Sequence, residues 1–164
     1  VLNVLSKKRR TEAMLDFVME KASSADIGLL YELETSCFPL PWSQQSLSLL
    51  LEQKDRGFCL KASPCDESSL ILGYVGFLYV LDEGEITKIA VAPSFRNHGI
   101  GSALLLQLIS LAAAQGIAKI HLEVSINNKT AISLYEKNGF CIVGKRKNYY
   151  ADTGEDAMIM TREI

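Results

Sequence analysis

Several features that define whole classes of protein are missing from this sequence of 164 residues. No apolar run approaches the roughly 20 residues that a membrane-spanning helix needs, so we expect no membrane-spanning segment. The four cysteines form no C-x-x-C pair, and only two histidines accompany them. This pattern argues against a zinc site or a disulfide framework and fits free thiols in a reducing cytoplasm.

An excess of charge of one sign is also missing. The net charge is −2 and basic residues form no stripe, so direct binding to nucleic acid is not expected. Apolar residues make up 48% of the chain and charged residues 22%, which is typical of a globular domain with a sizeable core. We expect one domain over residues 14–164 and a flexible segment over residues 1–13. In that segment basic residues follow apolar ones, the reverse of a signal peptide.

One stretch, residues 85–107, organises the rest of the chain. Residues 86–91 are apolar and rich in β-branched side chains, which predicts a strand. A loop with two glycines follows over residues 94–101, and apolar residues then recur at helical spacing over residues 102–114. The first turn of such a helix has unpaired N–H groups and a partial positive charge, so the loop is suited to bind a phosphate.

The glycine loop differs from the common nucleotide-binding motifs. A Walker A loop ends in Gly-Lys followed by Ser or Thr, which does not occur here. A dinucleotide fingerprint would need a third glycine where Leu104 stands. The remaining pattern is R-x-x-G-x-G, from Arg96 to Gly101. Taken alone, it can also be a helix that simply begins with two glycines, so the rest of the chain has to decide.

Periodicity and turn residues predict the order β-α-α-β-β-β-α-β-α-β-β. The unit over residues 85–124 should be a crossover between parallel strands, with the ligand beyond the carboxyl end of the first strand. We therefore expect an α/β (α+β) fold with a mixed central sheet flanked by helices. The predicted strands cover residues 15–22, 57–62, 70–81, 86–91, 119–124, 140–149 and 156–162, and helices begin near Asp26, after Ser43, at Ser102 and after Asn128.

Three polar residues near the second parallel strand have structural as well as chemical interpretations. Glu123 alternates with the apolar residues of its strand and can be a solvated carboxylate. Tyr135 can pack on one face of its helix, and Asn128 can cap that helix. Each residue alone favours the structural interpretation, so the segments around them have to be considered together.

Several separated segments resemble the GNAT family of N-acetyltransferases. The R-x-x-G-x-G loop, with Ala-Val-Ala-Pro before it, resembles the family's coenzyme A loop. Residues 37–43 (CFPLPWS), 122–140 (LEVSINNKTAISLYEKNGF) and 146–160 resemble the bacterial ribosomal-protein alanine N-acetyltransferases within the family. The matches occur in the right order and extend over about residues 14–164. One departure is Arg96, where this subfamily often has Gln.

The resemblance implies the GNAT fold, acetyl-CoA as cosubstrate and no metal. It implies a cytoplasmic enzyme, a monomer or weak dimer, whose acceptor is the N-terminal alanine of ribosomal protein S18. By resemblance, Glu123 is the proton acceptor and Tyr135 the proton donor. The implied cofactor-binding residues are Ile89, Ala90, Val91, Arg96, Asn97, His98, Gly99, Ile100, Gly101, Ser102 and Asn128. The implied acceptor-binding residues are Phe38, Trp42, Tyr149 and Tyr150, although Trp42 and Tyr150 can equally cover the core.

The implied chemistry is consistent with the residues. An amine must be neutral to attack a thioester, and an α-amine with a pKa of roughly 7.7 to 8.0 is partly neutral near pH 7, unlike lysine at about 10.4. Glu123, acting through water, suits such an amine, and the Tyr135 hydroxyl can protonate the departing thiolate. A backbone N–H near Val91 can stabilise the charge on the thioester oxygen. Direct transfer then needs no covalent enzyme intermediate.

Two alternatives remain open from the sequence. The first is an acetyltransferase with another acceptor, such as a different protein N-terminus, a lysine or a polyamine. The second is an acyl-CoA-binding module without catalysis. Such a module would keep the loop at residues 96–101 but has no need for both Glu123 and Tyr135, so their joint presence favours an enzyme.

Overall fold

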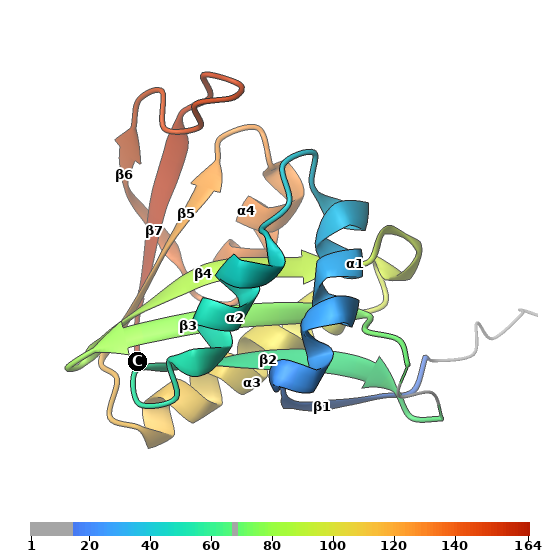
Figure 1. Cartoon of the computed structure of the whole chain (residues 1–164). Helices are drawn as coiled ribbons and strands as arrows, with labels where there is room; N and C mark the ends of the chain where they lie inside the picture. The colour runs from blue at the N-terminus through green and yellow to red at the C-terminus, as the bar shows by residue number, and fades with distance from the viewer. Residues whose placement is uncertain (1–14, 67–68) are drawn as a thin grey trace, which may run out of the picture.

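The computed structural model describes residues 15–66 and 69–164, so residues 1–13, where we expect a flexible segment, lie outside it. The described residues form a mixed seven-stranded sheet in the order β1-β2-β3-β4-β5-β7-β6 (Figure 1). Its strands are β1 (Phe17–Lys21), β2 (Gly57–Pro64), β3 (Gly73–Val80), β4 (Glu83–Val91), β5 (Lys119–Ser125), β6 (Cys141–Arg146) and β7 (Ala157–Glu163). The helices are α1 (Ile27–Cys37), α2 (Gln44–Glu52), α3 (Ile100–Ala114) and α4 (Lys129–Lys137), with short 3₁₀ turns η1 (Ser24–Asp26) and η2 (Pro93–Phe95).

The predicted order of elements is confirmed, as are the mixed sheet and the parallel pairing of β4 with β5. Two predicted helix caps are confirmed as well. The Ser43 hydroxyl accepts a hydrogen bond from the Ser46 N–H at 3.1 Å at the start of α2. At the start of α4, Asn128 Oδ1 accepts from the Ala131 N–H at 3.1 Å. Both bonds satisfy N–H groups that a helix leaves unpaired in its first turn.

Several predicted boundaries are wrong by a few residues. Between the predicted strands, Asp82-Glu83-Gly84 is typical of a tight turn, so the sequence predicts a turn at residues 82–84. The turn between β3 and β4 is instead Leu81-Asp82, with Leu81 at φ 57. Gly84 is already inside β4, opposite Tyr79. The helix α3 begins at Ile100, two residues earlier than predicted, and β6 ends at Arg146. Tyr149 and Tyr150 therefore lie in the β6–β7 loop and are free of the sheet pairing.

The larger apolar cluster packs α3 and α4 against one face of the sheet. Leu104, Leu105 and Leu108 of α3 are fully buried beneath β3 and its neighbours. Burying each such leucine contributes roughly 1.5–3 kcal/mol to folding.

None of the helices in the described ranges has both the length and the apolarity that crossing a membrane requires.

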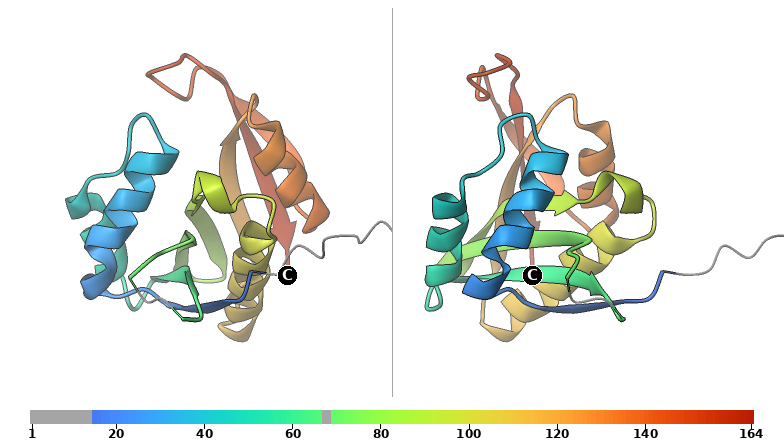
Figure 2. Two further views of the ribbon diagram at one scale, coloured as in Figure 1. Left: turned by 90° about the vertical axis from the view of Figure 1, so that its right-hand side faces the viewer. Right: turned by 45° about the vertical axis from the view of Figure 1, so that its right-hand side comes forward.

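A second apolar cluster packs α1 and α2 against the opposite face (Figure 2). Its sheet residues come from β2, β3 and β4, for example Cys59, Tyr74 and Ala90. Within the described residues, β5, β6 and β7 contribute nothing to this cluster. On this side, helices therefore leave the face of β5 and β7 uncovered.

The two parallel strands separate soon after they pair. β4 pairs with β5 only over residues 83–85. Beyond that point a register shift places Phe77 opposite Ile86 and Gly76 opposite Lys88, so Thr87 is an extra residue in β4. Such a bulge bends a strand and increases its twist. β4 and β5 thus separate toward their carboxyl ends, where the sequence places the ligand.

Candidate active site

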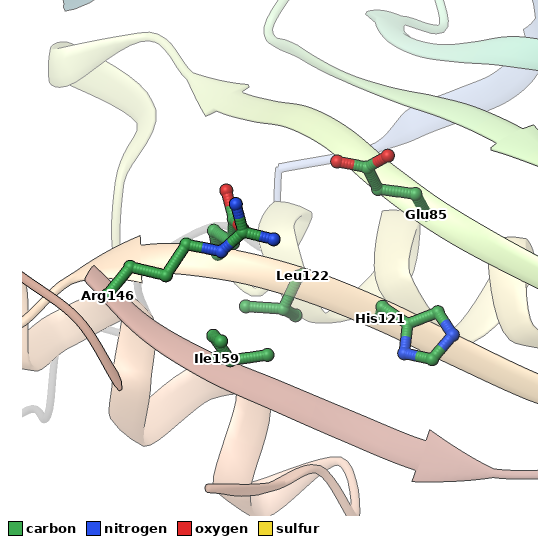
Figure 3. A pocket seen from close by; sticks show the side chains of 6 residues that line it. Glu85, His121, Leu122, Arg146 and Ile159 are labelled. Carbon is green, nitrogen blue, oxygen red and sulfur yellow. The ribbon is translucent and has the colours of Figure 1, made fainter. Parts of the chain in front are cut away.

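A pocket of about 260 Å³ lies on the uncovered face, beside the separation of β4 and β5 (Figure 3). Glu123 of β5 is one of its walls, with its side chain 18% exposed. The flanking residues Leu122 and Val124 are buried in the larger cluster, so strand alternation directs Glu123 to the pocket side. The pocket is lined by Glu85, His121, Leu122, Glu123, Arg146 and Ile159.

Two side chains hold the Glu123 carboxylate. Arg146 Nε of β6 lies 2.8 Å from Glu123 Oε1. A side-chain hydrogen bond to Glu123, together with burial, raises the pKa of Tyr149 to about 12, so this hydroxyl stays protonated and donates to the carboxylate. The Arg146 guanidinium in turn lies 5.8 Å from the centre of the Tyr149 ring. The structure therefore brings predicted residues Glu123 and Tyr149 together and adds Arg146, which the sequence did not indicate.

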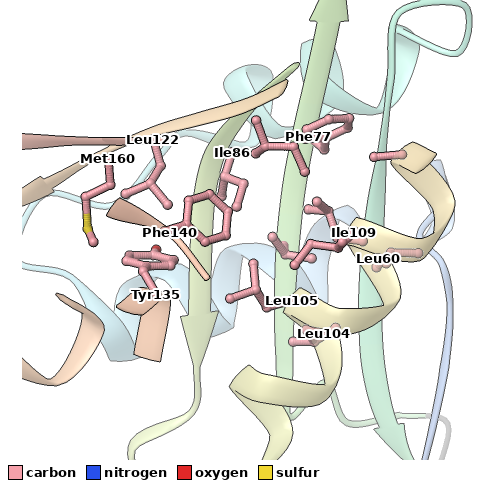
Figure 4. Packing of buried hydrophobic residues seen from close by; sticks show 14 of the residues in the cluster. Leu60, Phe77, Ile86, Leu104, Leu105, Ile109, Leu122, Tyr135, Phe140 and Met160 are labelled. Carbon is pink, nitrogen blue, oxygen red and sulfur yellow. The ribbon is translucent and has the colours of Figure 1, made fainter. Parts of the chain in front are cut away.

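Tyr135 of α4 lies on the other side of the sheet from Glu123. It is 4% exposed within the larger cluster, with its ring 5.7 Å from that of Phe140 (Figure 4). Burial, with a smaller electrostatic effect of Tyr150, raises the pKa of Tyr135, so its hydroxyl keeps its proton at neutral pH. A substrate reached by both Glu123 and Tyr135 has to lie between the separating strands β4 and β5.

Backbone groups of β4 face this separation. The Ala92 N–H donates to the Leu72 carbonyl at 2.8 Å. Ala92 and Leu72 therefore form a hydrogen-bonded pair that continues the antiparallel ladder between β4 and β3. In an antiparallel ladder such pairs alternate, so the N–H and C=O of Val91 point away from β3, toward β5. The Val91 carbonyl accepts from Arg96 Nε at 3.1 Å and from Cys37 Sγ at 3.5 Å. Its N–H thus faces the space between the strands, as the predicted oxyanion donor should.

Ile89 and Ala90, the other predicted residues of this strand segment, divide between the two sides. The alternation that directs the backbone groups of Val91 toward β5 directs those of Ile89 the same way. The side chain of Ala90 is 5% exposed and packs in the second cluster with α1. Ile89 and Val91 are therefore the members of the segment whose backbone can contact a substrate between the strands.

The predicted phosphate loop forms a sharp turn into α3. Asn97 and Gly99 have positive φ angles of 65° and 80°. The side chain of Ile100 is buried in the core. Because α3 begins at this residue, the N–H groups of Ile100, Gly101 and Ser102 have no partner within the helix and can bind a ligand. A Cβ at position 99 would have no heavy atom within 4 Å, so this part of the loop is open to a large anion. The loop therefore fits a pyrophosphate group.

Arg96 and His98 in this loop, and Asn128 at the start of α4, make contacts of their own. Arg96 bonds the Val91 carbonyl, as described above. His98 is exposed, and its Nδ1 lies 2.8 Å from the Arg96 carbonyl, which stabilises the loop. Asn128 uses its Oδ1 to cap α4. These structural roles are observed, and the predicted contacts of the three side chains with coenzyme A stay predictions.

We expect Gly99→Ala to destabilise the protein by about 1–2 kcal/mol, because an L side chain at φ 80° is strained even though the space around it is open. Gly28→Ala in α1 is the matched control. Its Cβ also meets nothing within 4 Å, but its φ is not positive, so we expect a gain of about 0.5–1 kcal/mol. Urea unfolding of both variants measures the two changes. Shifts of the same sign would contradict the role assigned to the turn.

Phe38 and Trp42 lie in the loop between α1 and α2. Both rings pack partly buried on the second cluster, and both face the Lys88 ammonium, at 4.0 Å for Phe38 and 5.0 Å for Trp42. In the β6–β7 loop, Tyr149 and Tyr150 stack edge to face with ring centres 5.2 Å apart. Trp42 therefore does help to cover the core. The acceptor-binding role of Phe38, Trp42, Tyr149 and Tyr150 stays a prediction.

The cysteines form no disulfide among the described residues, and all four are free. Burial raises the pKa of the Cys59 thiol to about 12, which makes it a poor nucleophile. Cys65 and Cys141 are exposed. In the described ranges, no group of three or more His, Cys, Asp or Glu side chains is arranged to hold a metal ion.

Sequence reasoning missed several charged residues around the site. Arg146 gave no signal, because it reaches Glu123 across the intervening strand β7. Glu34 did give one, since it occurs on the buried face of α1 with Leu30 and Leu33, where a charge has to be paired. Glu85 and His121 line the pocket as alternating polar residues of β4 and β5, a pattern that is common on any exposed face.

Comparisons with known proteins agree with this geometry. The model of the acetyltransferase (GNAT) family matches residues 27–140. The ribosomal protein bS18-alanine N-acetyltransferase of Escherichia coli (strain K12) is 33% identical over 143 residues, covering 86% of this chain and 93% of that protein. The crystal structure of the ribosomal-protein-S18-alanine N-acetyltransferase from Escherichia coli has a TM-score of 0.82 at 31% identity, covering 91% of this chain and 94% of that chain.

A more distant structure has the same fold with a ligand. Arabidopsis thaliana NAA60 in complex with acetyl-CoA has a TM-score of 0.80 at 17% identity, covering 91% of this chain and 99% of that chain. At that identity the likeness supports the fold alone. The family match extends over most of the chain, and the resemblance to the ribosomal-protein alanine N-acetyltransferases is confirmed. This chain is an enzyme that belongs to the acetyltransferase (GNAT) family.

Proposed function

We propose that this enzyme transfers an acetyl group from acetyl-CoA to the N-terminal alanine of ribosomal protein S18, in the cytoplasm. The relatives of the previous section support this acceptor, since they carry that activity in their names over nearly the same length of chain. The observation that carries the proposal is the Glu123 carboxylate, held by Arg146 and Tyr149 at a pocket beside the separated strands. A fixed carboxylate beside an open pocket is what deprotonation of an incoming amine requires.

The residues of this chain take separate parts in the proposed transfer. The N–H groups at the start of α3 bind the pyrophosphate of acetyl-CoA, and the backbone of Ile89 and Val91 lines its thioester arm. The Val91 N–H donates to the thioester oxygen as negative charge develops on it. Phe38 and Trp42 on one side and Tyr149 and Tyr150 on the other hold the acceptor peptide.

The proposed reaction is a direct displacement. The α-amine forms a C–N bond with the acetyl carbon, and the C–S bond of the thioester breaks. The proton that leaves the amine passes through water to Glu123, and the departing sulfur receives a proton from the Tyr135 hydroxyl. At neutral pH, on the order of a fifth of α-amine groups are already neutral. For lysine side chains the neutral fraction is only on the order of 0.1%. A carboxylate base therefore favours an N-terminal amine over a lysine side chain.

We expect the enzyme to add one acetyl group to a short peptide that begins Ala-Arg and to leave unchanged the same peptide with a blocked N-terminus and an internal lysine. The free α-amine is the acceptor in the proposed reaction, and lysine is protonated at the assay pH. Intact-mass analysis after incubation with acetyl-CoA measures the result. If acetyl-CoA binds but neither peptide gains mass, the alanine N-terminus is the wrong acceptor. Acetyl transfer to the blocked peptide would point to lysine.

A further inference from the structure

A fully buried carboxylate lies beneath the loop between α1 and α2. Glu34 of α1 is 0% exposed, and its carboxylate accepts three hydrogen bonds. They come from the Tyr74 hydroxyl at 2.5 Å, from Lys88 Nζ at 2.8 Å and from the Trp42 N–H at 2.7 Å. Burial and the neighbouring Glu34 raise the pKa of Tyr74, so its hydroxyl keeps its proton and donates. A buried charge needs such partners, so these contacts depend on one another.

The Lys88 ammonium connects this carboxylate to the loop. It lies 4.0 Å from the centre of the Phe38 ring and 5.0 Å from that of Trp42, and its side chain is only 14% exposed. A cation over aromatic faces is attracted more strongly when it is shielded from water. One ammonium group therefore holds both rings and, through Glu34, the Trp42 backbone.

The bulge in β4 is the reason that Lys88 faces this loop. Ile86 packs in the larger cluster with α3, on the other side of the sheet. Strict alternation would direct residue 88 to the same side as residue 86. The extra residue Thr87 reverses the alternation, so Lys88 points toward α1. The same bulge bends β4 away from β5, so it orients Lys88 and also opens the space for the thioester.

We infer that Glu34 and Lys88 are positioning residues that fix the α1–α2 loop, residues 38–42, in the shape that binds the acceptor peptide. The inference rests on the proposed function, because it assigns these residues to the acceptor side of that reaction. Lys88 directly precedes the β4 segment that lines the thioester, so it holds the loop in register with the acetyl donor. Neither residue contacts the reacting atoms, and their effect passes through Phe38 and Trp42.

The experiment compares the intact enzyme with two variants of this pair. Lys88→Met alone would leave the Glu34 charge buried without its cation, which can prevent folding. The double variant Glu34→Gln with Lys88→Met removes both charges, keeps an acceptor for the Trp42 N–H and removes the cation over both rings. Lys88→Arg keeps the charge and the contact with the rings. The double variant Asp26→Asn with Lys61→Met is the matched control, because it removes another buried ion pair, at 2.6 Å, at the opposite end of α1 from the loop.

Trp42 is the only tryptophan of the chain, so its fluorescence reports on the loop without any substrate. We expect acrylamide to quench Trp42 at least twice as strongly in the Glu34/Lys88 double variant, because the ring is no longer held. The KM for the Ala-Arg peptide should rise about tenfold, which corresponds to the loss of a shielded cation–π contact. The KM for acetyl-CoA and kcat should stay within about threefold, and Lys88→Arg should keep the peptide KM of the unmodified enzyme.

The control separates positioning from stability. Melting temperatures should fall in both double variants, whereas quenching and peptide KM should change only in the Glu34/Lys88 variant. A folded Glu34/Lys88 variant with unchanged quenching or unchanged peptide KM would overturn the inference, as would equal changes in the matched control. If the intact enzyme acetylates no N-terminal alanine, the proposed function fails instead. The quenching comparison, which needs no acceptor, then still decides whether Lys88 holds the loop.

Discussion

Replacing Glu123 by Gln is expected to lower kcat/KM for the alanine peptide by at least about 100-fold, since a positioned general base contributes typically 10²- to 10⁴-fold. The amide has nearly the shape of the carboxylate, and its oxygen can still accept the Arg146 Nε–H, which lies 2.8 Å from Glu123 Oε1. The change therefore removes the base and leaves the local packing intact. Steady-state kinetics with acetyl-CoA and the free-amine peptide measure the loss.

Glu85→Gln is the matched control for this substitution. Glu85 lines the same pocket from β4 and its replacement changes the net charge by the same amount, but it is assigned no proton transfer. We expect its kcat/KM to stay within about threefold of the unmodified enzyme, as for a surface charge near a site. Equal losses in the two variants would show that the pocket contributes through its negative charge as a whole and not through proton transfer to Glu123. Normal activity of Glu123→Gln would exclude Glu123 as the base.

The pH dependence of the Glu123→Gln deficit gives a second readout. An α-amine has a pKa of roughly 7.7 to 8.0, so nearly all of it is neutral by pH 9. A base is needed most when the amine still carries its proton. The ratio of unmodified to variant activity should therefore fall as the pH rises from about 7 to 9. A constant ratio would mean that Glu123 acts by holding Arg146 and Tyr149 instead of by accepting a proton.

The parts of the site that the sequence predicted are those encoded by local pattern. The glycine loop, the helix after it and the cap at Asn128 each depend on residues within a few positions of one another. The alternation of Glu123 with Leu122 and Val124 predicted its direction away from the core, which the structure confirms. These features required no knowledge of how the strands are ordered in the sheet.

The parts that the sequence could not give depend on contacts between distant segments. β7 lies between β5 and β6, so Arg146 reaches Glu123 across a strand that follows it in the chain. Lys88 would be assigned to the wrong face without the bulge at Thr87, and nothing in residues 83–91 marks that position. Leu81 adopts a positive φ where the sequence favoured Gly84 for the turn, because the pairing of Gly84 with Tyr79 fixes the hairpin register.

Tyr135→Phe is expected to lower kcat by roughly 10- to 100-fold while the KM values of both substrates stay within about threefold. Only the hydroxyl is removed, and the ring keeps its packing at 5.7 Å from Phe140. The effect should be smaller than that of Glu123→Gln. Burial raises the pKa of the Tyr135 hydroxyl, whereas an ordinary thiol has a pKa of about 8.5. Full proton transfer to the thiolate is therefore uphill, and hydrogen bonding to the developing charge supplies much of the stabilisation.

Tyr79→Phe is the control that separates this role from the general effect of removing a tyrosine hydroxyl next to the same cluster. Tyr79 also packs in the larger cluster, with its ring 6.1 Å from Phe77, but it lies on β3 near the opposite end of β4 from Val91. We expect its kcat to equal that of the unmodified enzyme. Calorimetric titration with coenzyme A should give the same affinity for both variants, because neither substitution alters the loop at residues 96–101. A Tyr135→Phe enzyme with normal kcat would leave the thiolate to be protonated by water, and the separation of β4 and β5 would then serve to admit solvent as well as the thioester.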